Sequence, residues 1–242
     1  ETFRQALTEA EIEPVFLHAI YLINRDSQKK EVREKGVHSL INSMELAVSI
    51  GSTGVIFHPG SHGGAGYDAV FPKAVSAIQR VLENSPEGPC LLLENMVGMG
   101  QQIGAQFVEL GRILRAVDSP RLRVCLDTQH AFAAGYDLTT KPGIDAMIDE
   151  FDRDVGVASL LAVHANDSKR PCGSGVDRHD NIGEGFIGEE GFAAIMGNEA
   201  SSDGLLLLEV PGFASPDEKA KGPDRKKIDI LKNIRQSLGI PA

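Results

Sequence analysis

The segment VCLDTQHAFAAGYD, residues 124–137, carries the clearest indication of the fold. It begins as a continuous apolar run, and within four residues it presents Asp127 and His130, before small residues and a glycine follow. A continuous rather than alternating apolar run is typical of a strand that is buried on both faces of a parallel sheet. The segment therefore predicts a buried strand that ends in a carboxylate and an imidazole.

Five other short apolar runs resemble this one, and segments of helix length separate them. The six predicted strands cover residues 15–17, 54–57, 90–93, 123–126, 160–163 and 205–208. The predicted helices cover residues 1–11, 30–50, 71–82, 107–117, 145–154, 192–196 and 224–238. Because a strand–helix–strand crossover is right-handed, successive strands should lie side by side with one polarity. The sequence predicts a single α/β domain over residues 1–242.

Each predicted strand is followed immediately by a residue whose polar side chain can bind metal. In chain order these residues are His18, His58, Glu94, Asp127, His164 and Glu209. Any one of them alone is more simply interpreted as a helix cap or a solvated loop residue. The carboxyl ends of parallel strands meet at one edge of a sheet, however, and that edge is where barrels and open α/β sheets hold their chemistry. Six such residues after six strands therefore indicate a shared metal or substrate site.

Three further residues extend this set. His130 follows Asp127 by three positions, and Asp177 and His179 form an Asp-x-His pair in the loop after the fifth predicted strand. Histidine and carboxylate ligands without cysteine suit a catalytic site for Zn²⁺, with Mn²⁺ or Fe²⁺ as alternatives. We expect Asp127 and His130 to bind neighbouring ions of one cluster.

The composition limits the classes of partner. The formal net charge of −10 argues against a protein that coats nucleic acid indiscriminately, but bound metal can neutralise a local anionic face. Lys169, Arg170 and Arg178 flank the loop with the Asp-x-His pair and are candidate phosphate contacts. Three cysteines without a CxxC pair suggest reduced thiols and a cytoplasmic protein. The apolar runs are too short to cross a bilayer, so we expect no membrane association.

Seven stretches of the sequence, in order from about residue 12 to residue 211, resemble the endonuclease IV family of apurinic/apyrimidinic (AP) endonucleases. They are HAIYLIN (18–24), FHPGSH (57–62), LENMVGMG (93–100), CLDTQHAFAAGYD (125–137), VHANDSK (163–169), VDRHDNIGEGFIG (176–188) and LLLEVP (206–211). DTQHAFAAGYD and VDRH…IGEG are the most specific of these motifs.

The resemblance implies a TIM (β/α)8-type barrel with three metal ions, commonly zinc, that hydrolyses double-stranded DNA on the 5′ side of abasic sites and leaves a 3′-hydroxyl. It implies that Glu94 bridges two of the ions and orients or deprotonates the attacking water, and that Tyr21 helps to distort the DNA. The implied ligands are His18, His58 and Glu94 for the first ion, Glu94, Asp127, His164 and Glu209 for the second, and His130, Asp177 and His179 for the third.

The sequence departs from the family at its front end, where the first two strand–helix units have no counterpart. We therefore expect six strands, a truncated start and an incompletely closed barrel. One alternative is a single-metal sugar isomerase or epimerase, which would use Glu94, Asp127, His164 and Glu209 and leave the other five candidates without a role. Another is an inactive fragment that binds metal or DNA. We expect a monomer, and a dimer formed through the open sheet edge is the alternative.

Overall fold

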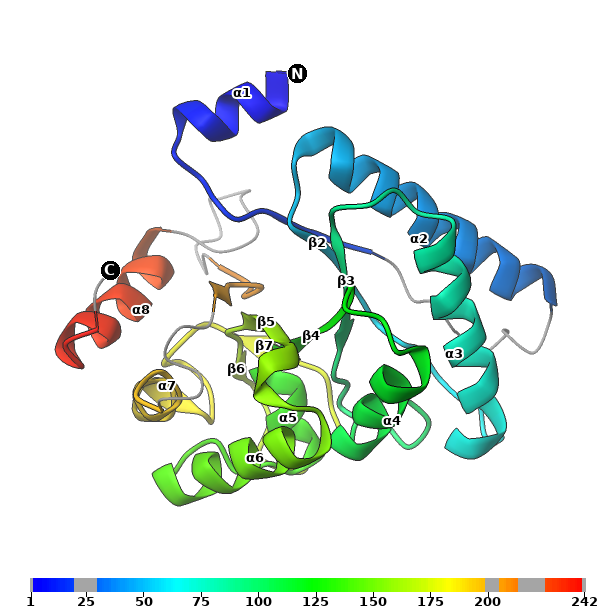
Figure 1. Ribbon diagram of the computed structural model, residues 1–242. Coiled ribbons are helices and arrows are strands. Elements are labelled where there is room, and N and C mark those ends of the chain that lie inside the picture. Colours follow the sequence, from blue (N-terminus) through cyan, green and yellow to red (C-terminus); the bar gives the residue numbers. More distant parts are fainter. Residues whose placement is uncertain (1, 20–29, 199–204, 213–224, 241–242) are drawn as a thin grey trace.

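A six-stranded parallel sheet forms the centre of the molecule and curls like part of a barrel (Figure 1). The computed structural model describes residues 2–19, 30–198, 205–212 and 225–240. The sheet has the order β1-β2-β3-β4-β5-β8, so neighbouring strands follow one another along the chain. Its strands are β1 (Phe16–His18), β2 (Gly54–Phe57), β3 (Cys90–Glu94), β4 (Leu122–Asp127), β5 (Leu160–His164) and β8 (Leu206–Leu207). The predicted α/β barrel class and the six strands are confirmed.

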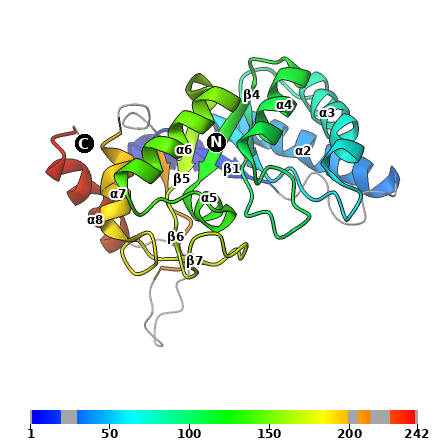
Figure 2. The same cartoon turned by 90° about the horizontal axis from the view of Figure 1, so that it is seen from below.

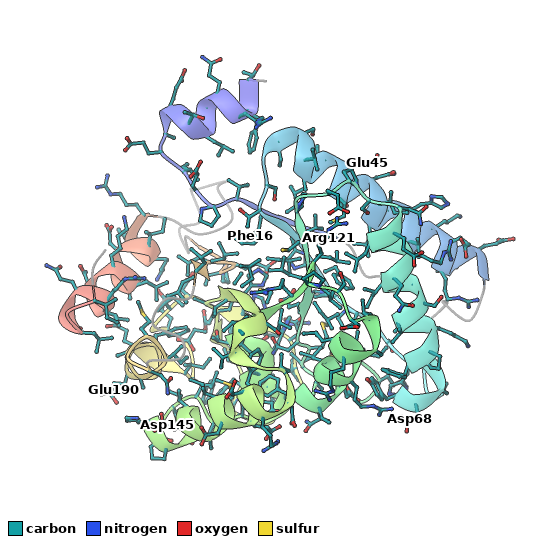
Figure 3. The ribbon with its side chains drawn as sticks, in the orientation of Figure 1. Phe16, Glu45, Asp68, Arg121, Asp145 and Glu190 are labelled. Carbon is teal, nitrogen blue, oxygen red and sulfur yellow. The ribbon has the colours of Figure 1, made fainter. Side chains whose placement is uncertain are left out.

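Helices cover the outer face of this sheet (Figures 1 and 2). The α-helices are α1 (Thr2–Glu9), α2 (Lys30–Ile50), α3 (Tyr67–Glu83), α4 (Phe107–Val117), α5 (Thr128–Ala134), α6 (Lys141–Asp154), α7 (Gly188–Met196) and α8 (Arg225–Ser237). A 3-10 turn (Val157–Ser159) precedes β5. Acidic side chains such as Glu45, Asp68 and Glu190 are exposed on α2, α3 and α7, so part of the negative charge lies on the outer helices (Figure 3).

Alternation along the strands divides the apolar side chains into two layers. Side chains on one face, including Val55, Leu91 and Val163, belong to a large core shared with the helices. Ile56, Leu92, Cys125 and Ala162 form a second, smaller cluster on the other face. All four residues of β2 are buried, as are the last four of β3 and of β4. Burial on both faces explains why these strands are continuously apolar in the sequence.

Two elements near the carboxyl ends of the strands were not predicted. α5 follows β4 directly, because the Asp127 side chain accepts a hydrogen bond from the backbone N–H of His130 and caps the helix. α5 ends at Gly135, which has a φ of 117° that favours glycine. The antiparallel pair β6 (Asp167–Ser168) and β7 (His179–Asp180) lies beside α5 and includes one residue of the Asp-x-His pair.

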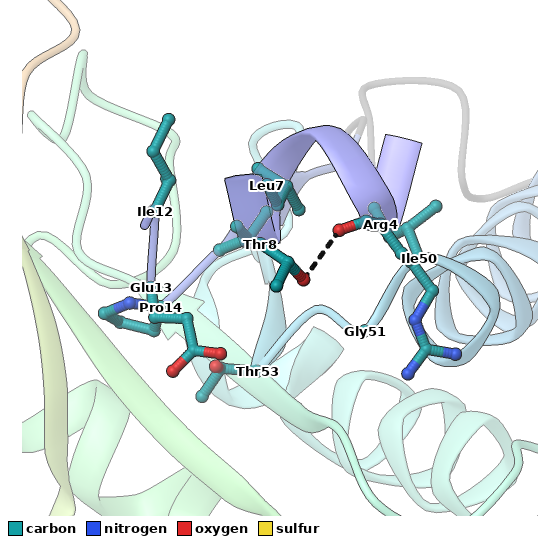
Figure 4. Close-up of a pocket in the computed structure, with 10 residues that line it drawn as sticks. Arg4, Leu7, Thr8, Ile12, Glu13, Pro14, Ile50, Gly51 and Thr53 are labelled. Atoms are coloured by element: carbon teal, nitrogen blue, oxygen red, sulfur yellow. Dashed lines mark hydrogen bonds between the residues drawn. The ribbon is translucent and has the colours of Figure 1, made fainter. Parts of the chain in front are cut away.

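The edges of the sheet are β1 and β8, each of which pairs with one strand among the described residues. β8 has two residues where the sequence predicted four. A hollow of about 450 Å³ lies between α1 and the amino ends of β1 and β2, and Pro14, Thr53 and Arg4 are among its lining residues (Figure 4). This hollow is at the opposite end of the strands from the candidate metal ligands. None of the described helices is both long enough and apolar enough to span a membrane.

Candidate metal centre

Glu94 lies at the centre of the polar cluster. It is the last residue of β3, and its side chain is fully buried. Glu94 Oε2 lies 3.0 Å from His18 Nε2 and 3.0 Å from His58 Nε2. Glu94 Oε1 lies 2.9 Å from His164 Nδ1. One carboxylate therefore contacts imidazoles that are delivered by β1, β2 and β5.

The parallel register brings these residues together. Asp127 ends β4 and is paired with His164 at the end of β5. Glu94 is paired with Cys125, two residues before Asp127 and on the same face of β4. Asp127 Oδ2 lies 3.7 Å from His164 Nδ1 as a result. Asp127 therefore caps α5 and also contributes to the cluster. The helix-cap and metal-ligand interpretations of this residue are both consistent with the structure.

The Asp-x-His pair approaches from the β6–β7 side. His179 Nε2 lies 3.4 Å from Asp177 Oδ1, and His130 Nε2 lies 3.7 Å from Asp177 Oδ2. The His130 ring is 2 % exposed, and its Nδ1 lies 2.8 Å from the Asn95 carbonyl oxygen. Asp177 is thus placed between two imidazoles from α5 and β7.

Glu209 completes the set from the segment that follows β8. Its Oε2 lies 3.6 Å from His164 Nδ1, and its carbonyl oxygen lies 3.1 Å from His179 Nδ1. The Glu209 side chain is 47 % exposed, so this side of the cluster is open to solvent. All nine residues that the sequence singled out as ligands thus lie in one cluster.

Potential ligand atoms in the described part of the chain form three overlapping groups, within which the atoms lie no more than 4.8 Å apart. The groups are His18, Glu94, His164 and Glu209; His58, Glu94 and His130; and Asp127, His130 and His179. Glu94 and His130 each belong to two groups. The geometry is therefore that of one continuous set of potential ligands, and it does not assign each side chain to a separate ion.

The pKa values of several side chains in the cluster differ strongly from their usual values. Burial opposes ionisation of Glu94, but hydrogen bonds with His164, His18 and His58 hold its pKa well below its usual value. Burial alone would lower the pKa of His18, but the contact with Glu94 raises that pKa to about 9. Burial likewise disfavours the charged form of His130, yet its carboxylate neighbours raise its pKa to about 10. Imidazolium ions therefore balance the buried carboxylates at neutral pH when no metal is bound.

The donor set fits divalent cations. His179 Nε2 is buried and has no hydrogen-bond partner among the described residues, and it faces Asp177 Oδ1 at 3.4 Å and Asp127 Oδ2 at 4.0 Å. Imidazole nitrogens and carboxylate oxygens are ligands of zinc, and three or four of them within 4.8 Å of one another can surround one ion. A metal ion would replace the imidazolium protons as the charge that balances these carboxylates.

The candidate phosphate contacts share one hollow, and its lining residues in the described part of the chain include none of the nine candidate ligands. Lys169, Arg170 and Arg178 line a hollow of about 630 Å³ beside the β6–β7 pair. Phe186 lines the same hollow and is 56 % exposed, a feature that the sequence patterns did not single out. Lys169 Nζ lies 4.0 Å from Asp180 Oδ1, which partly offsets its charge. Tyr21 lies outside the described residues.

Sequence reasoning also missed Asp167, which organises the loop after β7. Its buried carboxylate accepts hydrogen bonds from the backbone N–H groups of Ser168, Gly183, Gly185, Ile187 and Gly188. A Cβ on Gly185 would lie 2.5 Å from Asp167 Oδ1, so glycine is required for this close approach. The IGEG segment of the sequence therefore serves to enclose a carboxylate.

Comparison with known proteins places these features in a family. The family model described as a xylose isomerase-like TIM barrel matches residues 1–234. A probable endonuclease 4 from Haloarcula marismortui is 39% identical over 211 residues, which are 87% of this chain and 75% of that protein. The solved structure of endonuclease IV from Thermus thermophilus superposes with a TM-score of 0.80 at 32% identity, over 97% of this chain and 80% of that one. A D-tagatose 3-epimerase-like protein superposes with a TM-score of 0.76 at 22% identity, over 98% of this chain and 82% of that one, a likeness of fold alone.

Proposed function

Since the chain belongs to the endonuclease IV family, we propose that it is a DNA-repair AP endonuclease that hydrolyses the phosphodiester on the 5′ side of an abasic site and leaves a 3′-hydroxyl. The observation that supports this proposal most directly is the position of Glu94, whose buried carboxylate contacts imidazoles from three other strand ends. A hydrolase of this kind needs such a concentrated set of ligands in order to bind several divalent ions.

The proposed cofactor is three zinc ions per chain, for which Mn²⁺ or Fe²⁺ could substitute. His18 and His58 would hold the first ion with Glu94, which would also hold the second. Asp127, His164 and Glu209 would complete the second site, and His130, Asp177 and His179 the third. When bound, such ions lower the pKa of a water molecule, neutralise charge on the phosphoryl oxygens and stabilise the leaving oxygen.

Glu94 is the proposed catalytic residue. Its pKa is held well below its usual value, so the carboxylate stays ionised at neutral pH and is a hydrogen-bond acceptor. The proposed contribution of this carboxylate is to orient or deprotonate the attacking water. Water attacks phosphorus, the bond from phosphorus to the 3′ oxygen breaks, and that oxygen leaves with a proton as the 3′-hydroxyl.

The proposed substrate is double-stranded DNA that contains an abasic site. Lys169 and Arg178 are proposed to contact phosphates, since both line one solvent-open hollow beside the β6–β7 pair. Tyr21 is proposed to help distort the DNA at the lesion. We further propose that residues 1–242 form one nuclease domain that acts as a cytoplasmic monomer.

An incision assay tests this function. The full chain, supplied with zinc, should cut a duplex with one abasic site on the 5′ side of that site, and a chelator should stop the reaction. Glu94→Gln should lower the rate of incision at least about 100-fold while duplex binding is largely kept. Glu190→Gln, on the exposed surface of α7, is the matched control and should keep the wild-type rate.

The alternatives predict other results. Normal incision by Glu94→Gln would contradict the role assigned to Glu94. A wild-type chain that binds metal but does not cut would support the inactive fragment, and interconversion of sugars would support the isomerase. The isomerase needs only four of the nine clustered residues, and the likeness to a sugar epimerase extends to the fold alone.

A further inference from the structure

Asn166 joins two acidic residues of the cluster. Its side chain is fully buried in the turn between β5 and β6. Asn166 Nδ2 donates a hydrogen bond of 2.6 Å to Asp127 Oδ2, and Asn166 Oδ1 accepts one of 2.9 Å from the backbone N–H of Glu209. One amide thus spans from the end of β4 to the segment after β8.

The contact with Asp127 fixes the oxygen that faces the rest of the cluster. Asp127 Oδ1 is already engaged as the cap of α5, where it accepts from His130 N–H. Asp127 Oδ2 is the atom that lies 3.7 Å from His164 Nδ1 and 4.0 Å from His179 Nε2. Because both oxygens accept hydrogen bonds, the Asp127 carboxylate is held in one orientation. Asn166 restrains Oδ2, which is the oxygen that faces the other residues of the cluster.

The contact with Glu209 anchors the least supported ligand. β8 has only two residues and is an edge strand among the described residues, so little sheet pairing holds the segment after it. Asn166 Oδ1 and His179 Nδ1 each contact the backbone of Glu209. Asn166 is itself held in place, because its backbone N–H donates to Thr128 Oγ1 at 2.9 Å and its carbonyl oxygen lies 2.7 Å from the same hydroxyl.

We propose that Asn166 is a positioning residue that orients the Asp127 carboxylate and anchors the Glu209 backbone, so that both acidic residues are placed to bind a divalent ion. The inference rests on the proposed function, in which both carboxylates belong to the same metal site. Hydrogen bonds that orient a ligand typically change metal affinity by about 10- to 100-fold when they are removed. Asn166 contacts no reacting atom and acts only through the Asp127 side chain and the Glu209 backbone.

Asn166→Asp tests the proposal with almost no change in side-chain size. The new side chain keeps an acceptor for Glu209 N–H, but it loses the donor and places a carboxylate against Asp127 Oδ2. Asn181→Asp is the matched control, because Asn181 is also buried, accepts from Gly212 N–H and donates to Glu184. Asn181 contacts no carboxylate of the cluster.

The measurement is zinc affinity of the full chain, determined by competition with a chelator, together with the free energy of unfolding in excess chelator. Asn166→Asp should weaken the binding of one ion about 10- to 100-fold, whereas Asn181→Asp should retain the wild-type affinity even if it is less stable. Wild-type zinc affinity in Asn166→Asp, with or without lower stability of the metal-free chain, would overturn the proposal.

Asn166→Ser decides the question if Asn166→Asp does not fold, because serine removes both contacts without adding a charge. A similar loss of zinc affinity in this variant supports the proposal, and an unchanged affinity overturns it. A wild-type chain that binds no zinc would overturn the proposed function together with this inference. A wild-type chain that binds zinc beside variants that bind it equally well would overturn the inference alone.

Discussion

Asn95 clamps the backbone of Asp127 from the neighbouring strand. Asp127 N–H donates to Asn95 Oδ1 at 2.6 Å, and Asn95 Nδ2 donates to the Asp127 carbonyl oxygen at 3.0 Å. Both residues are buried, so water does not replace these bonds. The side chain after β3 thereby fixes the point at which β4 ends and α5 begins.

Asn95→Ala should therefore destabilise the fold. It leaves a buried donor and a buried acceptor unsatisfied, and each costs about 1 to 3 kcal/mol. We expect the free energy of unfolding to fall by about 2 to 5 kcal/mol in urea titrations. Asn84→Ala, at an exposed position, is the control and should change it by less than about 1 kcal/mol. Equal effects of the two substitutions would contradict the clamp.

Asp167→Asn should loosen the loop that follows β7. Five backbone N–H groups point at the Asp167 carboxylate, so an amide nitrogen in either orientation faces donors instead of accepting from them. We expect a loss of about 2 to 4 kcal/mol of unfolding free energy. Asp152→Asn is the control, because Asp152 is exposed and accepts from only Val157 N–H among the described residues. A loss no larger than that of the control would show that the loop does not depend on Asp167.

Much of the fold follows from sequence patterns because the sheet is buried on both faces. Continuous apolar runs located all six strands to within two residues, and amphipathic spacing gave α2 and α4 with the observed ends. α5 was missed because its seven residues, TQHAFAA, are too few to show a helical period. The β6–β7 pair was missed because two-residue strands have no period either.

For the candidate site, the sequence predicted the ligands but not the residues that support them. The topology of a parallel sheet alone brings residues from all six strand ends to one edge, so His18 and Glu94 could be expected near each other across 76 residues. Asn95 and Asn166 could not be found in this way. Asparagine after a strand is common in turns, and the partners of these two side chains lie 32 to 43 residues away. The sequence did not single out Phe186, because it is of interest only through its position beside the cationic residues that line the same hollow.

The stability of the metal-free chain should fall at alkaline pH. His18 and His130 have folded-state pKa values of about 9 and about 10 against a usual 6.5, so they bind protons more tightly in the folded chain. Their contribution is fully present below pH 6.5 and is lost as pH rises toward 9 and 10. Thermal unfolding in excess chelator should show this decline, and His130→Gln should flatten it. His38→Gln, at an exposed position on α2, should leave the profile unchanged.

The same chain should lose stability at acid pH for the opposite reason. The pKa values of Glu94 and Asp177 are lowered from usual values of 4.5 and 3.8. Their contribution is present above those values and is lost as pH falls through the lowered ones. Metal-free stability should therefore be highest between about pH 4.5 and pH 6.5. A maximum above pH 8 would contradict the proton distribution described for the cluster.

The salt dependence of DNA binding should change when the proposed phosphate contacts Lys169 and Arg178 are removed. Lys169→Ala and Arg178→Ala should each reduce the slope of the logarithm of the binding constant against the logarithm of salt concentration by about one. Lys73→Ala, on the exposed surface of α3, is the control and should leave the slope unchanged. Fluorescence anisotropy with an abasic duplex, in the presence of metal but with Glu94→Gln to prevent cutting, gives these slopes. Unchanged slopes in both Lys169→Ala and Arg178→Ala would mean that DNA does not contact the hollow that these two residues line.

The metal content of the chain is the most direct test of the central claim, that nine clustered side chains form a trinuclear zinc centre. The protein should be purified without chelator and without added metal, and its metals counted by elemental analysis. We predict about three ions per chain, mostly zinc, because the overlapping ligand groups around Glu94 and His130 can surround that number. One ion per chain, or none, would contradict the trinuclear centre.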